Sequence, residues 1–193
     1  MASAAFVAAV AACGHRPPAP ATVERTEAPP RPGVAQNAAA MDDVKVRVEQ
    51  FAAERDRAAD ALPPLRDKAE RDEIVAHERA LASRLAAERG RTNETIFTAR
   101  TETLFRRLIT EAVRQPGGRA TRASVLDENP GAIALAPNRP YPDGIVVSTV
   151  PPEILKALPA LPPDVEYRFV GKHLIIRDTR ANFVVDVLKD ALP

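Results

Sequence analysis

The sequence has little of the residues that make most chemical sites easy to recognise. It contains one cysteine, three histidines and no tryptophan among 193 residues, and aromatic residues make up only 4% of the chain. A single cysteine excludes an internal disulfide and any metal cluster held by several cysteines. The scarcity of aromatic rings argues against a platform that stacks nucleic-acid bases. We therefore expect a core of Leu, Ile, Val and Ala and no cofactor.

The chain also lacks an excess of charge of one sign. Its 27 basic and 26 acidic residues leave a formal net charge of +1. This balance gives no global field that would attract nucleic acid or an acidic substrate. We expect neither nucleic acid nor a small-molecule substrate as a partner.

Catalytic and metal-binding patterns are missing as well. The sequence contains no G-x-S-x-G motif, no phosphate-binding loop and no Rossmann glycine pattern. His15, His77 and His173 lie in three different parts of the chain, whereas a metal site needs several ligands close together. We predict a protein that is not an enzyme and has no catalytic, cofactor-binding or metal-ligating residues.

Three polar residues near the end of the chain are the nearest approach to a cation site. Asp178, Asn182 and Asp186 do not have the spacing of a calcium-binding hand. Turn capping and outward positions on strands explain them without a ligand.

The first thirteen residues have the features of an export signal. Residues 2–12 form an apolar run about as long as the central part of a signal peptide and too short to cross a bilayer, although no Lys or Arg precedes it. Residues 10–14, VAACG, then look like a bacterial lipobox, in which the cysteine thiol takes the lipid. Cys13 is therefore the predicted lipid-attachment residue, and cleavage near Ala11 without lipidation is the alternative.

A lipid on Cys13 would place the protein on the periplasmic side of the cell envelope, as an outer-membrane lipoprotein. Residues 14–40 are rich in Pro, Ala, Thr and Glu and have few large apolar side chains. Burial cannot offset the ordering entropy of such a segment. We predict a disordered tether that holds the folded part clear of the membrane, and a merely unstructured leader is the alternative.

Residues 41–115 predict a helical region. No proline occurs between residues 65 and 115, and apolar residues recur at helical spacing. The expected helices cover residues 41–62, 65–89 and, after a cap at Thr92 or Asn93, the stretch to Gln115. A helical hairpin or short coiled coil is the favoured arrangement, with the balanced charges on solvated faces. Partner binding or self-association through these helices is the alternative, because the apolar stripes exceed what one helix needs.

The end of the chain predicts a small α+β domain over residues 125–193, after a flexible linker of residues 116–124. Short strand candidates are residues 132–136 and 145–147, and Pro151 can begin a helix over residues 151–158. The strongest strand-like runs are residues 165–170, 173–178 and 183–188. Only Gly171 and Lys172 separate the first two runs, which suits a type II′ turn. These runs predict an antiparallel β-meander.

The two-residue turn fixes the register of the first two strands. Counting back from it places Tyr167 opposite Ile176 on one face and Glu166 opposite Arg177 on the other. The predicted inward residues are Val165, Tyr167, Phe169, Leu174 and Ile176. The second face carries further apolar residues at Val170, Ile175 and Val184 or Val185. We expect the helix over residues 151–158, or a partner, to cover that second face.

Residues 150–188 resemble a C-terminal module of uncharacterised exported bacterial proteins and lipoproteins. A looser similarity is to the hairpin of periplasmic nickel and cobalt homeostasis proteins of the RcnB type. The positions that carry it are Pro162 and Pro163, Tyr167, Val170 and Gly171, and Val184 and Val185. The resemblance implies an envelope protein with a small α+β module, and it brings no catalytic residues.

Together these patterns predict an α+β protein with an N-terminal helical hairpin or coiled-coil region and a small C-terminal domain that holds the β-meander. The function they favour is that of an exported, lipid-anchored bacterial envelope protein with a structural or partner-binding role. The expected partners are the membrane, through the lipid on Cys13, and a protein or second copy, through residues 41–115. The alternative is a periplasmic nickel or cobalt homeostasis or sensing protein.

Overall fold

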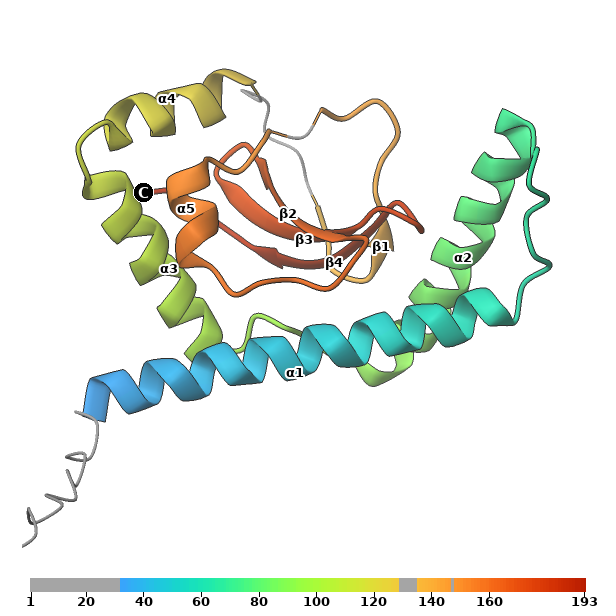
Figure 1. Ribbon diagram of the computed structural model, residues 1–193, viewed down its shortest axis with the longest axis horizontal. Helices are drawn as coiled ribbons and strands as arrows, with labels where there is room; N and C mark the ends of the chain where they lie inside the picture. Colours follow the sequence, from blue (N-terminus) through green and yellow to red (C-terminus); the bar gives the residue numbers. More distant parts are fainter. Residues whose placement is uncertain (1–31, 129–134, 147) are drawn as a thin grey trace, which may run out of the picture. The chain divides into compact units, whose positions relative to one another are not determined.

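Four antiparallel strands form the sheet at the centre of the fold. The computed structural model describes residues 32–128, 135–146 and 148–193. In chain order the strands are β1 (Arg139–Pro140), β2 (Val165–Val170), β3 (His173–Asp178) and β4 (Phe183–Leu188). Their order in the sheet is β1-β4-β3-β2, and helices fill the N-terminal part of the chain (Figure 1). The predicted α+β class and the β-meander are confirmed.

The meander has the predicted bounds and the predicted register. Tyr167 pairs with Ile176 and Glu166 pairs with Arg177. Gly171 has a φ of 56°, which the first central position of a type II′ turn requires and which glycine adopts without steric cost. All five predicted inward residues are buried in the main core.

The second face of the sheet is covered by residues 135–145 and not by α5 (Pro152–Ala157). The segment contributes Leu135, Tyr141 and Ile145. These pack on the buried side chains of Val170, Ile175, Val184 and Val187. The short helix α5 lies instead on the first face, where Ile154 is fully buried in the main core. The expectation that α5 or a partner covers the second face was wrong, because the apolar residues of the covering segment are separated by turns and show no period.

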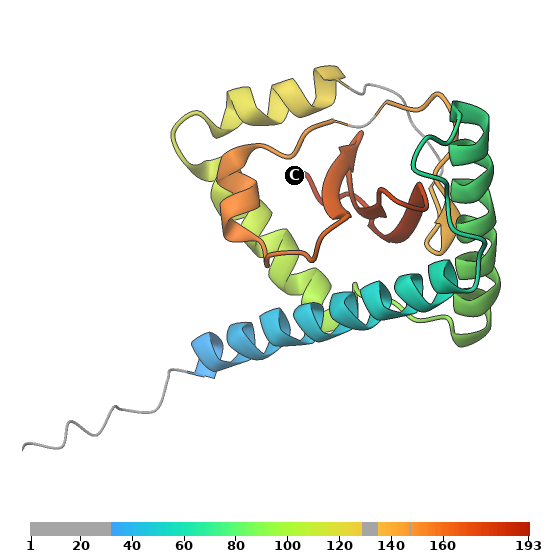
Figure 2. The same cartoon turned by 45° about the vertical axis from the view of Figure 1, so that its right-hand side comes forward.

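Four further helices surround the sheet: α1 (Pro32–Asp60), α2 (Arg71–Thr92), α3 (Ala99–Arg114) and α4 (Gly118–Glu128). In Figures 1 and 2, α3, α1 and α2 lie on three sides of the sheet and α4 on the remaining side. None of the helices within the described ranges combines the length and the apolar content needed to span a bilayer.

Helix α1 begins earlier than the sequence pattern indicated. It starts at Pro32, so the last part of the predicted tether, residues 14–40, is helical. Ala40 is already buried, and Val44, Val48 and Phe51 continue the same stripe at spacings of three or four residues. Residues 33–39 are exposed or half-buried, so this part of α1 extends the packed helix outward, and its alanine content favours the helical conformation. Cys13, the rest of the predicted export signal and residues 14–31 lie outside the described residues.

The boundaries of α2 and α3 follow from caps that were misplaced in the prediction. Residues 65–70 are not helical, because α2 starts after a capping box in which the Glu70 N–H donates to Glu73 Oε2 at 3.2 Å. Asn93 ends α2 in the left-handed conformation, with a φ of 50°. The cap of α3 is therefore not Thr92 or Asn93 but Thr98, whose side chain accepts a hydrogen bond from the Thr101 N–H at 3.4 Å.

The predicted linker, residues 116–124, contains the start of α4. A Cβ atom at Gly118 would lie 1.9 Å from the Val113 carbonyl oxygen, so only glycine fits this close approach. The chain from Arg31 to Pro193 forms one compact unit, in which the helical region and the sheet share one main core. The division into a helical region of residues 41–115 and a separate domain of residues 125–193 is corrected accordingly. Of the two short strand candidates, residues 145 and 146 of 145–147 are not in a strand, and Ser148 forms an isolated bridge to Phe169 instead. Residues 132–134 of the candidate 132–136, and residue 147, lie outside the described residues.

Candidate functional site

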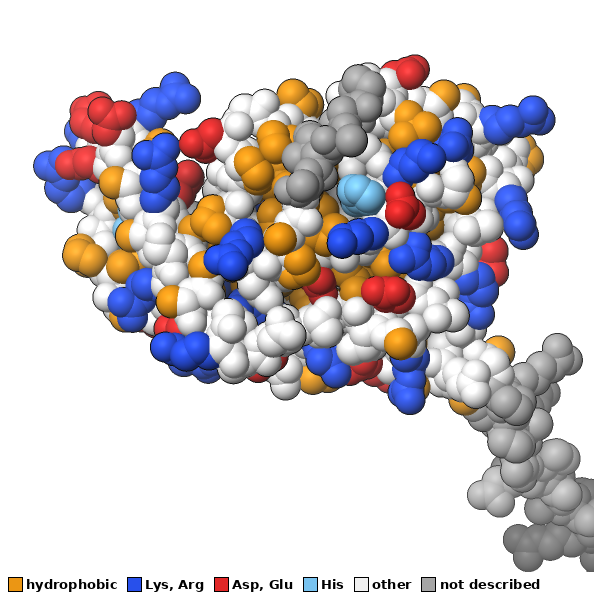
Figure 3. Space-filling view, turned by 180° about the vertical axis from the view of Figure 1, so that it is seen from behind, with side chains coloured by type: hydrophobic (Ala, Val, Ile, Leu, Met, Phe, Trp, Pro, Cys, Tyr) orange, Lys and Arg blue, Asp and Glu red, His pale blue; other side chains and the backbone are white. Residues whose placement is uncertain are grey.

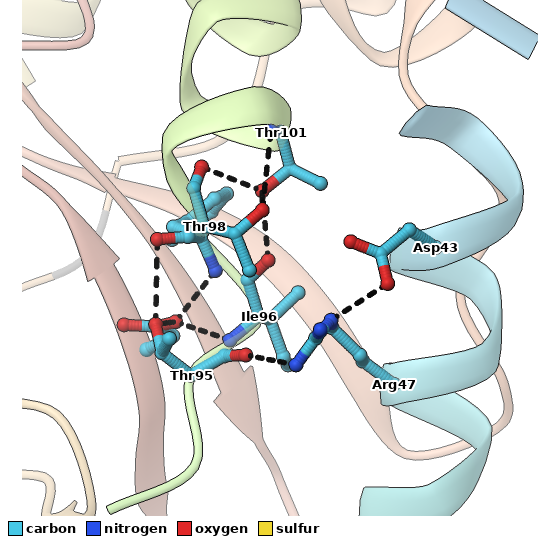
Figure 4. Close-up of polar contacts among 8 residues, drawn as sticks. Asp43, Arg47, Thr95, Ile96, Thr98 and Thr101 are labelled. Carbon is cyan, nitrogen blue, oxygen red and sulfur yellow. Dashed lines mark hydrogen bonds and ion pairs between the residues drawn. The ribbon is translucent and has the colours of Figure 1, made fainter. Parts of the chain in front are cut away.

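Asp186 of β4 is a buried anchor for the connection between α2 and α3. It is 2% exposed, and its Oδ2 accepts hydrogen bonds from the Ile96 N–H at 2.6 Å and the Phe97 N–H at 2.8 Å. The Thr95 hydroxyl donates to the same oxygen at 2.6 Å. Figure 4 shows this turn next to α1, where Arg47 donates to the Thr95 carbonyl oxygen at 3.1 Å. The Asp186 carboxylate therefore accepts its hydrogen bonds from groups of the same chain and holds the turn against β4.

A bulge explains why Asp186 points inward, although the sequence predicted an outward strand position. The pairing between β3 and β4 shifts between Ile176 and Arg177, so that Ile176 pairs with Asp186 and Arg177 pairs with Val184. The extra residue in β4 turns the following side chain to the other face. Asp186 consequently lies on the helix-covered side of the sheet.

Asp178, at the end of β3, forms a buried ion pair with α1. Its Oδ2 accepts from Arg55 Nη1 at 2.9 Å, and its Oδ1 accepts from the Ala181 N–H at 2.7 Å. Burial raises the pKa of Asp178 above its ordinary value, and Arg55 and the Ala181 N–H offset part of that rise. The predicted turn-capping role is confirmed by the Ala181 bond, whereas the predicted outward position was wrong because the side chain is fully buried.

Arg89 of α2 forms buried hydrogen bonds at the edge of the sheet that β1 occupies. Its Nε donates to Asn138 Oδ1 at 2.6 Å and its Nη1 to Glu54 Oε2 at 2.7 Å. The guanidinium also lies 5.2 Å from the centre of the Phe51 ring, at cation–π distance. Arg89 is 3% exposed and is thus committed to partners within the chain.

The histidines do not come together in the described part of the chain. His77 lies on α2, whereas His173 begins β3 and its Nδ1 accepts from the Asp190 N–H at 2.9 Å. His15 falls outside the described residues. No group of three or more His, Cys, Asp and Glu side chains within the described ranges is placed to hold a metal ion.

The surface charge is mixed. Figure 3 shows Lys and Arg side chains interspersed with Asp and Glu over one face of the molecule. Some of these charged side chains pair with one another at the surface, as Arg180 does with Asp56 at 2.8 Å. This face has no patch of one sign that would recognise a polyanion.

A groove of about 560 Å³ runs along the outer edge of β2. One wall is formed by Thr149 and Val150, and the other by the end of α5 and the turn that follows it. The apolar residues that line the groove are Val150, Leu155, Leu158, Pro159, Ala160, Leu161 and Val165. Leu155 is 50% exposed, so part of this apolar surface faces solvent.

One residue of β2 beside the groove, Tyr167, has main-chain groups without a hydrogen-bond partner among the described residues. Val170 and His173 close the two-residue turn as a hydrogen-bonded pair, so alternate residues of β2, including Tyr167 and Phe169, direct their N–H and C=O away from β3. Phe169 exchanges both groups with Ser148, at 2.9 and 3.2 Å. Tyr167 has no such partner among the described residues, because the chain turns away from β2 after Ser148 towards Pro151. Its N–H and C=O are therefore available at the edge.

Charged side chains flank this open edge. Glu166 accepts from Arg168 at 2.7 Å and from Arg177 at 3.0 Å. Burial alone would raise the pKa of Glu166, but the hydrogen bonds and charges of the two arginines lower it below its ordinary value. The predicted pairing of Glu166 with Arg177 is confirmed. The Nε of Arg168 is buried and has no hydrogen-bond partner among the residues that the structure describes.

A second hollow, of about 420 Å³, lies between α2 and residues 140–143. Tyr141 lines it, and its buried hydroxyl group has no hydrogen-bond partner within the described ranges. Burial raises the pKa of Tyr141, although the charge of Arg177 acts in the opposite direction. This hollow has less apolar lining and no open strand edge, so the groove beside β2 is the stronger candidate site.

No family model, no curated protein and no solved structure matches this chain. The resemblance of residues 150–188 to exported bacterial modules therefore stays a prediction.

The groove was not predicted from the sequence. Two signals could have indicated it. Pro151 and Pro152 prevent the segment after Ser148 from continuing as a strand beside β2. The run LPALPP at residues 158–163 places apolar residues in a turn, where solvent exposure is expected.

Proposed function

We propose that this protein is an exported, lipid-anchored bacterial envelope protein whose folded part binds a protein partner. The observation that carries the partner-binding role is the open edge of β2 beside an apolar groove. The anchor rests on the sequence alone, on Cys13 within the VAACG segment. The expected location is the periplasmic side of the envelope, as an outer-membrane lipoprotein.

The buried charges support a binding role more than a catalytic one. Asp178, Asp186 and Arg89 each have partners within the chain that hold helices against the sheet. Catalytic acids and bases instead direct unsatisfied groups into a cleft. The groove beside β2 presents apolar side chains and main-chain groups, which are the features of a protein-binding surface.

Labelling with a fatty acid, followed by separation of the membranes, tests the anchor. The wild-type protein is expected to take up the label and to collect with the outer membrane. A Cys13→Ser variant should lose the label. Unlabelled wild-type protein in the cytoplasm would contradict the proposed location.

Photo-crosslinking in the cell tests the partner-binding role. A crosslinking amino acid placed at Leu155 probes the groove, and the same amino acid at Leu65 probes the exposed connection between α1 and α2. The role predicts a defined adduct with another protein from at least one of these positions. Lack of an adduct from every surface position tested would contradict it. An adduct confined to positions on the helices would favour the predicted association through residues 41–115.

The metal-homeostasis alternative stays a prediction from the hairpin resemblance. Calorimetric titration of the protein with nickel and cobalt tests it. Absence of binding at micromolar metal would remove it.

A further inference from the structure

The open edge of β2 combines unpaired main-chain groups with an apolar wall. The N–H and C=O of Tyr167 point away from β3, and Tyr167 lines the groove together with Val150, Leu158 and Leu161. In strand addition, such main-chain groups give affinity and the pockets for alternate side chains give specificity. We propose that β2 takes up an extended segment of a partner protein as an added strand, with apolar residues at alternate positions and a carboxylate beside Arg168. This inference rests on the partner-binding function proposed above.

The length of the open edge favours a short segment over a second copy of the chain. Phe169 is already paired with Ser148, and the Val165 N–H donates to the Pro162 carbonyl oxygen at 3.2 Å. If two β2 strands paired antiparallel, the main-chain groups of Tyr167 would be nearly the only ones free to form hydrogen bonds between the two copies. The groove follows residues 165–168, a length of about 13 Å at roughly 3.3 Å per residue. A segment of about four extended residues matches that length.

The charge at the edge specifies an acidic residue in the segment. Two guanidinium groups, of Arg168 and Arg177, share the single carboxylate of Glu166. The Arg168 Nε is buried without a partner, and a buried donor without an acceptor is unfavourable. A carboxylate from the added segment would give this donor a charge-assisted hydrogen bond and balance the second arginine.

A random library of eight-residue peptides displayed on phage, panned against the full chain, tests the inference. The expected consensus has apolar residues at alternate positions and one Asp or Glu. The synthesised consensus peptide is then titrated while amide hydrogen exchange is followed by NMR. Binding is expected to slow exchange of the Tyr167 amide about tenfold or more, because the amide gains an acceptor.

Matched variants locate the binding. Leu155→Glu places a charge in the groove, and Leu65→Glu, at a leucine of similar exposure, is the control. The groove variant is expected to weaken binding of the consensus peptide about tenfold or more, and the control to leave it unchanged. Arg168→Gln should weaken binding of the acidic peptide and should not affect a peptide in which Gln or Asn replaces the acidic residue. Circular dichroism of each variant shows that its fold is retained.

Three results with peptides would overturn the inference. They are equal enrichment of peptides on the wild type and on Leu155→Glu, a bound peptide that leaves Tyr167 exchange unchanged, and a consensus without an acidic residue. Self-association that Leu155→Glu abolishes, with no peptide enriched, would overturn it in favour of a second copy. Binding only to phospholipid vesicles would overturn it in favour of a lipid.

These results are separable from the proposed function. Cellular crosslinks from Leu65 and none from Leu155 would leave partner binding intact and defeat strand addition. Peptide binding in the groove by a protein that stays unlipidated in the cytoplasm would leave strand addition intact and defeat the envelope location.

Discussion

At one edge of the sheet, β1 is two residues long and ends in Pro140, whereas the opposite edge is the six-residue strand β2. Natural proteins protect sheet edges with short strands, proline and covering elements, because an exposed edge pairs with other chains. The β1 edge has all three, since α2 covers it and Arg89 bonds to Asn138 there. Among the described residues, the β2 edge is protected where Ser148 pairs with Phe169 and where the Val165 N–H donates to the Pro162 carbonyl oxygen, and Tyr167 between them is left unpaired. The open part of β2 is the surface at which we propose that a partner adds a strand.

The largest effect is expected at the closed edge. Arg89→Met should lower the free energy of unfolding by about 3 kcal/mol, because Asn138 and Glu54 lose a buried charged donor. Urea denaturation followed by circular dichroism measures it. Arg84→Met, at an exposed position of the same helix, is the control and should change stability by less than about 0.5 kcal/mol. Equal stability of the two variants would show that Arg89 does not hold this edge closed.

The second effect concerns β4, which joins β1 to the rest of the sheet. Asp186→Asn keeps the shape of the side chain but removes the charge that accepts from Ile96 and Phe97. We expect a loss of about 2 kcal/mol in the free energy of unfolding, in the range of a charge-assisted hydrogen bond replaced by a poorly matched amide. The same urea experiment measures it. A loss no larger than that of an exposed control such as Asp127→Asn would argue against the anchoring role.

A substitution at the open edge should change the free energy of unfolding less, and the size of the change should depend on pH. The pKa of Glu166 is lowered in the folded protein, so its contribution is present above the unfolded pKa of about 4.5 and is lost as the pH falls through the folded value. Glu166→Gln should therefore cost about 0.5–1 kcal/mol at pH 7, and the cost should disappear in acid. Urea midpoints of wild type and variant, compared from pH 7 down to pH 3, measure this. A difference that persists unchanged at the lowest pH would contradict the ion-pair explanation.

The smallest effect is a difference in the rate of amide hydrogen exchange along β2, which involves no change in stability. The Tyr167 N–H has no acceptor among the described residues, whereas the Arg168 N–H is paired with Ile175 and the Phe169 N–H with Ser148. In the unliganded protein we expect the Tyr167 amide to exchange faster than both neighbours, because exchange there needs no opening of the strand pair. Native-state hydrogen exchange by NMR measures it. Equal protection at all three residues would show that the edge is closed.

The sequence was a good guide to the meander for physical reasons. Gly171 and Lys172 leave room for only one tight turn, and alternation then fixes the pairing of Tyr167 with Ile176. The same local rules could not predict the bulge after Ile176 or the inward position of Asp186. That position depends on amide donors about ninety residues away in the chain, which no window of sequence contains.

Helix boundaries and the candidate site were less predictable for a related reason. Several residues in the chain could cap α3, and the choice of Thr98 is made by the anchored turn before it. The groove is formed jointly by Val150, Leu161 and the edge of β2, and its existence depends on where the chain leaves Ser148. Such a surface arises from the tertiary path and has no motif of its own.

The bonds from Asp186 to Ile96 and Phe97 also set an order of events during biosynthesis. The turn between α2 and α3 is made early, but its buried amides find their acceptor only when the last strand has left the ribosome. Until then the helices cannot complete their packing, so the nascent chain stays incompletely folded until β4 has been synthesised.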